Sequence, residues 1–102
     1  MTEPEPIQFR VPHGTDIYGE MFSVIGDGEW LDQDILQVRL ASGFGVDVGW
    51  YPALDPNGSF GVVAYQNSNF NDQIRPMFRT PDPEQAAMRV QHWIDELSGE
   101  KK

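Results

Sequence analysis

The chain has 102 residues, of which 39% are hydrophobic and 12% aromatic, and its 16 acidic and 7 basic residues give a net charge of −9. This length and apolar content predict one folded domain with a modest core and argue against intrinsic disorder. The only lysines are Lys101 and Lys102, so the clustered basic residues that bind nucleic acid or anionic membranes are missing. The absence of cysteine excludes disulfides, thiolate zinc ligands and thiol catalysis.

The chain begins with an acidic, proline-rich stretch, MTEPEP, which lacks the basic and apolar regions of a signal peptide. No apolar run approaches the roughly 20 residues that span a bilayer. We therefore expect a soluble, cytoplasmic protein. Residues 1–6 are predicted to form a flexible tail and residues 7–99 a single domain.

Two strands are predicted before residue 26. Ile7, Phe9 and Val11 alternate with polar residues and stop at Pro12, which predicts a strand over residues 7–11. The stretch DIYGEMFSVI predicts another over residues 16–25, with Gly19 as a bulge. Residues 26–34 are polar and predict a connector.

Residues 35–51 predict a hairpin with a three-residue loop at 41–43. Such a loop keeps all the alternating apolar side chains on one face, whereas a two-residue loop would oppose Val38 to Asp47. The predicted register pairs Leu40 with Phe44, Val38 with Val46, and Leu36 with Val48.

A second hairpin is predicted to turn at DPNG, residues 55–58, whose residue types favour a type I turn followed by a bulge. If Asp55 pairs with Ser59, the core face of the first hairpin continues into the second. The predicted register sets Leu54 opposite Phe60, Pro52 opposite Val62, and Trp50 opposite Ala64.

The last third predicts a loop at 66–72, an edge strand at 73–80 that contains Pro76, and a C-terminal helix. Asp82 is the expected N-cap, Pro83 the first helical residue, Gln85 the partner of a capping box, and Gly99 the C-cap. An apolar stripe of Ala86, Val90, Trp93, Ile94 and Leu97 follows at helical spacing. The predicted fold class is α+β: an antiparallel four- to five-stranded meander sheet with one C-terminal helix packed on one face.

Catalytic motifs are weak in this chain. His13 and His92 lie in different predicted elements and are interpreted as surface residues. The carboxylates of Asp27, Glu29, Asp32 and Asp34 do not follow the order of an EF-hand loop, so we interpret them as a solvated acidic loop. We predict no catalytic residue, no metal site and no cofactor, and lean against an enzyme.

The predicted sheet has a second face, opposite the core, that suits recognition. Three glycines leave this face flat, and tyrosine is enriched at protein interfaces because it supplies contact area with few rotamers to order. The predicted partner-binding residues are Tyr51, Val63, Tyr65 and Asp47 on this face, with Asp27, Glu29, Asp32 and Asp34 in the acidic loop.

Part of the sequence resembles a family of small acidic immunity proteins from bacterial polymorphic-toxin systems. The resemblance rests on DGEW at 27–30, the alternating apolar residues of 36–40, GFGVDV at 43–48, and Phe78 ahead of DPEQAAMRVQHWIDEL. It covers residues 27–48 and, more loosely, 77–97, and departs at Leu31 and Asp32, where the family has an acid–His pair. It implies a non-enzymatic bacterial protein that binds and neutralises a toxin.

Three hypotheses about function follow. The leading one is a small acidic binding module, immunity-like, for a protein with a basic surface, because opposite charge steers association. The alternative is a small ligand- or metal-binding protein or an enzyme that uses the acidic loop 27–34. The third is a homodimer without another partner.

Overall fold

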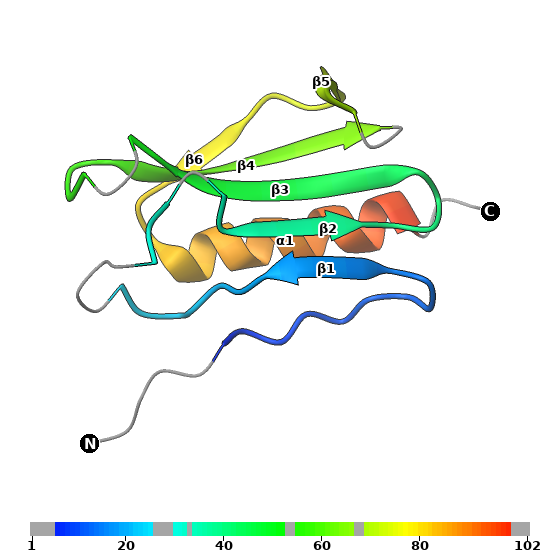
Figure 1. The fold of residues 1–102 in the computed structure, drawn as a ribbon, viewed down its shortest axis with the longest axis horizontal. Helices are drawn as coiled ribbons and strands as arrows, with labels where there is room; N and C mark the ends of the chain where they lie inside the picture. Colours follow the sequence, from blue (N-terminus) through cyan, green and yellow to red (C-terminus); the bar gives the residue numbers. More distant parts are fainter. Residues whose placement is uncertain (1–5, 26–29, 33, 53–54, 67–68, 99–102) are drawn as a thin grey trace.

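The computed structural model describes residues 6–25, 30–32, 34–52, 55–66 and 69–98. Five strands follow one another in an antiparallel meander, and one C-terminal helix lies along one face of the sheet (Figure 1). This arrangement confirms the predicted α+β fold class. The strands are β1 (Asp16–Gly19), β2 (Leu36–Arg39), β3 (Phe44–Tyr51), β4 (Ser59–Gln66) and β5 (Asn69–Gln73).

Two further elements complete the fold. A short strand, β6 (Phe78–Thr80), pairs with β4 beside the stretch that β5 occupies. The helix α1 (Pro83–Ser98) packs against β3, β4 and β6. No helix in the described part of the chain is long and apolar enough to cross a bilayer.

The first hairpin has the predicted register. Leu36 pairs with Val48 and Val38 with Val46, and the Leu40 amide donates to the carbonyl of Phe44 over 2.9 Å. Gly43 has a φ of 99°, a conformation that favours glycine at the end of the three-residue loop. The alternation of apolar residues excludes a slip by one residue, which would expose the core set, and the three-residue loop ending at Gly43 selects this register among those that remain.

The second hairpin does not have the predicted register. Trp50 pairs with Phe60 instead of Ala64, so the register differs by four residues from the prediction, and the ladder ends at Tyr51 and Ser59. Leu54, which was predicted to pair with Phe60, lies outside the described residues. The DPNG turn itself forms, with the Gly58 amide donating to the carbonyl of Asp55 over 2.9 Å. The ladder does not run up to this turn, because Pro52 has no N–H to donate.

The loop is instead tied to the end of β3 by the indole of Trp50, whose Nε1 donates to the carbonyl of Asp55 over 2.8 Å. Because the shift is by an even number of residues, each side chain keeps its predicted face. Trp50, Phe60, Val62 and Ala64 are accordingly all buried in the core.

The N-terminal elements differ from the prediction. Residues 7–11 are not a strand, although their apolar side chains pack against the core. Pro6 forms a bridge with Phe22, so this one described residue of the predicted tail is attached to the domain. The second predicted strand is shortened to β1, which ends at Gly19 instead of bulging there. A Cβ on Gly19, at a φ of 88°, would lie 2.1 Å from the carbonyl oxygen of Ile35.

The edge beyond β4 was also predicted wrongly. Most of the loop predicted over residues 66–72 is strand, since β4 extends to Gln66 and residues 69–72 belong to β5. The single strand predicted over 73–80 is interrupted at residues 74–77 and resumes as β6. Pro76 lies in this interruption, where no ladder hydrogen bond is required of it.

The helix begins as predicted, with Asp82 as N-cap: its Oδ1 accepts a hydrogen bond from the Glu84 amide over 3.0 Å. The capping box is absent because the buried Thr80 takes its place. The Thr80 hydroxyl accepts from the Asp82 amide over 3.1 Å and donates to Gln85 over 3.2 Å. The predicted stripe is buried, whereas Gly99 lies outside the described residues.

Candidate functional site

The face of the sheet that points away from α1, here called the outer face, carries a polar cluster centred on Asp47 of β3. The strand registers place Gln37 of β2 and Val63 of β4 directly on either side of Asp47. Arg39 and Tyr65 flank Gly45 in the neighbouring row. The sequence prediction placed Asp47 among its binding residues but omitted Gln37 and Arg39, whose alternation with apolar residues in LQVRL puts them on this face.

Two of the predicted binding residues are not exposed. Val63 is 1% and Tyr65 3% accessible, which contradicts their assignment to an open recognition surface. The ring of Tyr65 lies over Gly45, where a Cβ would come within 2.5 Å of it. The face is therefore not flat at Gly45 or Gly61, because aromatic rings occupy the space above these two glycines.

Val63 is enclosed from its two sides along β4. Tyr65 lies on one side, and on the other Gly61 is covered by Met77 and by the ring of Tyr51. A Cβ on Gly61 would lie 2.9 Å from the Met77 sulfur and 3.1 Å from the Tyr51 ring. Tyr51 remains half-buried, so it is the one predicted aromatic with substantial exposed surface.

Asp47 is half-buried and has an unusual proton affinity. Its pKa is raised to about 6, first by burial and then by the negative charge of Asp34. A hydrogen bond from Gln37 and the charge of Arg39 oppose this rise without cancelling it. Arg39 is partly engaged elsewhere, because its Nη2 donates to the Gln37 side chain over 3.2 Å.

The same carboxylates affect both tyrosines. Burial raises the pKa of Tyr51, and the charges of Asp47 and Asp34 raise it further against Arg79. Burial likewise raises the pKa of Tyr65, with Asp47 adding to the effect. The two phenols therefore stay protonated near neutral pH and present neutral, hydrogen-bonding hydroxyls beside the carboxylates.

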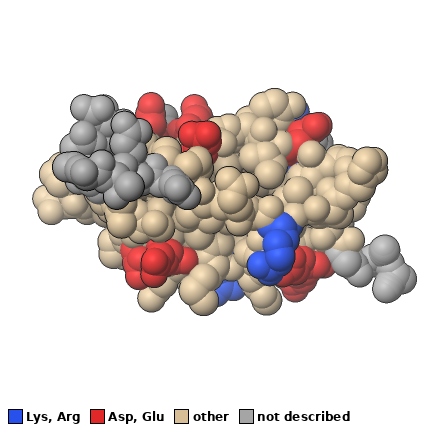
Figure 2. All heavy atoms as spheres, turned by 90° about the horizontal axis from the view of Figure 1, so that it is seen from below, with Lys and Arg blue, Asp and Glu red and all other residues tan. Residues whose placement is uncertain are grey.

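The acidic loop is described only in part. Asp27 and Glu29 lie outside the described residues, whereas Asp32 and Asp34 are exposed. Among the residues that the structure describes, no three acidic or histidine side chains are grouped to hold a metal ion. Viewed from the side on which β1 and the N-terminal segment lie, acidic side chains appear in several places and basic ones are few (Figure 2).

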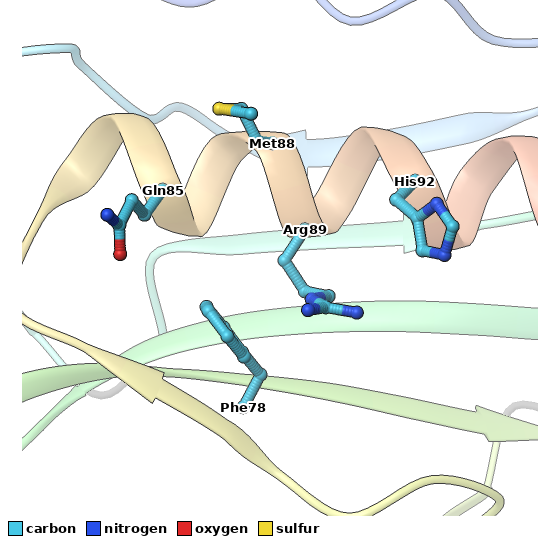
Figure 3. Close-up of a pocket in the computed structure, with 5 residues that line it drawn as sticks. All are labelled: Phe78, Gln85, Met88, Arg89 and His92. Carbon is cyan, nitrogen blue, oxygen red and sulfur yellow. The ribbon is translucent and has the colours of Figure 1, made fainter.

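A second surface was missed by the sequence prediction. A shallow groove between β6 and α1 is lined by Phe78, Gln85, Met88, Arg89 and His92 (Figure 3). His13 and His92 are both exposed, so both histidines are surface residues, as predicted. The sequence feature that could have indicated this groove is Met88, an apolar residue on the otherwise polar outer side of α1.

Comparisons with protein-family models, curated proteins and solved structures find no match for this chain. The resemblance to immunity proteins therefore stays a prediction. What the outer face offers chemically is the carboxylates of Asp34 and Asp47 beside the neutral phenol of Tyr51. Such an arrangement favours a cationic ligand, since a positive charge opposes both the burial and the negative charge of Asp34 that raise the pKa of Asp47.

Proposed function

We propose that this chain is a non-enzymatic binding module that captures a protein with a basic surface at the outer face, around Asp34, Asp47 and Tyr51. The observation that supports this proposal most directly is the half-buried carboxylate of Asp47, which shares its site with the charge of Asp34. A carboxylate in this position is costly for the unbound protein. Binding of a cation to the carboxylate offsets this cost.

An arginine of the partner fits this chemistry best. Its planar guanidinium donates several hydrogen bonds to carboxylate oxygens and stacks on aromatic rings. The outer face already contains two arrangements of this kind, with Arg79 over the Tyr51 ring at 5.9 Å and Arg39 over the Tyr18 ring at 5.5 Å. The net charge of −9 would also accelerate the approach of a basic partner.

The test compares capture by the wild type with capture by an Asp34→Asn/Asp47→Asn variant. The immobilised proteins are exposed to native-cell lysate, and bound proteins are identified by mass spectrometry. We expect a basic protein that the wild type retains and the double variant loses, while Asp16→Asn, an exposed carboxylate on β1, retains it. Equal retention by the double variant would refute the proposed site.

The pH dependence of capture gives an independent check. With a pKa of about 6, Asp47 is ionised above that pH and becomes protonated below it. Capture should therefore be strongest at pH 7–8 and weaken progressively toward pH 5, and the Asp47→Asn variant should lose this dependence. A capture that is unchanged between pH 7 and pH 5 contradicts a role for the Asp47 charge.

If the protein is immunity-like, as the resemblance implies, its partner is a toxin domain. Toxin domains that act on nucleic acid are commonly basic, which suits an acidic outer face, and the resemblance described above points the same way. The gene next to this one is the direct test. A neighbouring reading frame that encodes a large toxin, and a purified toxin domain that binds the wild type but not the double variant, are the expected results.

A further inference from the structure

The groove between β6 and α1 runs along the helix on the side away from the Asp47 cluster. Its first part is lined by Phe78, Gln85, Met88, Arg89 and His92. Phe78 of β6 and Arg89 of α1 point toward each other, whereas Met88 projects from another side of the helix (Figure 3). It continues toward the C-terminal half of α1 through a second hollow that shares Phe78, Arg89 and His92. Met88 is 70% exposed, so a large apolar side chain stands at the rim with nothing covering it among the described residues.

Arg89 gives this groove its charge. Its guanidinium lies 4.5 Å from the centroid of the Phe78 ring and 5.6 Å from that of Trp93. These cation–π contacts fix the position of the guanidinium over the two rings. Among the side chains that the structure describes, no carboxylate lies within ion-pair distance of Arg89.

The other two arginines near α1 are neutralised. Arg10 pairs with Asp95 over 3.6 Å, and Arg75 pairs with Glu96 over 3.0 Å. Both acidic partners belong to the last two turns of α1, and Glu96, which lines the second hollow together with Arg89, is paired with Arg75. In a chain with a net charge of −9, this groove thus presents an ordered positive charge that the neighbouring acids do not cancel.

We propose that the groove between β6 and α1 is a docking site for a peptide segment that carries a glutamate or aspartate next to a large apolar side chain. The carboxylate binds the guanidinium of Arg89, and the apolar side chain packs on Met88 and Phe78. A guanidinium that is already held over aromatic rings loses little rotamer freedom when it binds. The site goes beyond the proposed function, because it lies on the other face of the sheet and takes a ligand of opposite charge.

A single carboxylate suits the groove better than a polyanion. The surrounding acidic surface repels ligands with several negative charges, and this repulsion acts over the Debye length of roughly 8–10 Å. One carboxylate in contact with Arg89 gains a charge-assisted hydrogen bond that outweighs the distant repulsion. Nucleic acid and phosphorylated segments are therefore expected to bind more weakly than a singly charged peptide.

The test titrates the 15N-labelled full chain with a peptide, acetyl-Ala-Leu-Glu-Leu-Ala-amide, whose only charge is the glutamate. We expect saturable shifts in the amide signals of β6 and of α1 around Arg89. The matched peptide with glutamine in place of glutamate should bind about tenfold more weakly, as the loss of one charge-assisted hydrogen bond predicts. Equal binding of the two peptides, shifts confined to other elements, or no saturable shift at millimolar peptide would overturn the proposal.

Variants separate the groove from the rest of the protein. Arg89→Gln should reduce binding of the glutamate peptide about tenfold, whereas Arg39→Gln, which removes an arginine on the outer face of the sheet, should leave it nearly unchanged. If Arg89→Gln perturbs the fold, Met88→Glu tests the same site from an exposed position and should weaken the glutamate peptide more than the glutamine peptide. Asp34→Asn/Asp47→Asn should not change peptide binding, so this proposal and the proposed function fail independently.

Discussion

The two faces of the sheet are shielded from solvent by different groups. The inner face is covered by α1, whose buried stripe lies against apolar side chains of β3 and β4 and brings no charge into the core. The outer face is covered by its own side chains, with the Tyr65 ring over its cross-strand partner Gly45 and the Tyr51 ring near Gly61. Because this second kind of cover is incomplete, Asp47 stays half-buried between Gln37 and Val63, and the outer face combines burial with charge.

The largest effect should come from the inner face. Phe60 is fully buried and packs edge-on against Trp50, with ring centroids 4.8 Å apart. Phe60→Ala should lower the free energy of unfolding by about 3–5 kcal/mol, since it removes a core ring and leaves a cavity. Urea denaturation followed by tryptophan fluorescence measures this loss. A loss below about 1 kcal/mol would mean that the inner face is not the main core.

Tyr65→Ala tests the outer face. Because its ring is buried over Gly45, the variant should lose about 2–3 kcal/mol, somewhat less than an inner-face ring. Tyr51→Ala is the matched control and should lose less, since Tyr51 is only half-buried. The same denaturation experiment ranks the two. If both cost little, the outer face is an open surface after all, as the sequence alone suggested.

Asp47→Asn should make the protein more stable. A carboxyl whose pKa is about 6 in the folded protein and 3.8 as an isolated group binds more protons in the folded state between these values. Stability should therefore fall as the pH rises from about 4 to 6, and the penalty persists at pH 7. After allowance for solvent screening, it amounts to about 1 kcal/mol.

The measurement for Asp47→Asn is the free energy of unfolding at pH 4, 5, 6 and 7 for the wild type and the variant. The difference in favour of the variant should grow over this interval and level off above pH 6. Asp16→Asn, on exposed β1, should show no such growth. A variant that is less stable than the wild type at pH 7 would show that Asp47 is a structural group.

The smallest effect is expected at the rim of the α1 groove. Met88 is 70% exposed, and methionine and alanine both favour helices. Met88→Ala should therefore change the free energy of unfolding by less than about 0.5 kcal/mol, while it weakens binding of the glutamate peptide. A large loss of stability would place Met88 in the packed structure instead of at a docking surface.

The contrast between the two hairpins shows how far the sequence leads. In the first hairpin, apolar alternation and a three-residue loop with glycine agree on one register, and that register forms. In the second hairpin, alternation excludes shifts by one residue but not shifts by two, because a shift by two leaves every side chain on the same face of the sheet. The choice among these registers depended on the indole of Trp50 donating to Asp55, a contact across the loop that no local pattern encodes.

The candidate site shows the same division. The alternation of GFGVDVGWY and SFGVVAY placed Asp47, Tyr51 and Tyr65 on one face, and this placement is correct. It did not indicate that Tyr65 would be buried, because burial depends on the ring lying over Gly45 of the neighbouring strand. The Arg89 groove depends on how α1 packs against β6 after the short connection at residues 81–82, and the periodicity within each element does not give this packing.

The sequence by itself determined the α+β class, the first hairpin, the start and buried stripe of the helix, and the face on which each strand residue lies. These features follow from local rules: the period of two in strands, the period of 3.6 in helices, and the conformations that glycine and proline allow. Only the tertiary structure decided the second register, the cover of the outer face and the environment of Asp47. The second register involves the indole of Trp50 donating to the backbone of Asp55 across the loop. The cover of the outer face and the pKa of Asp47 depend on side chains that neighbouring strands bring together.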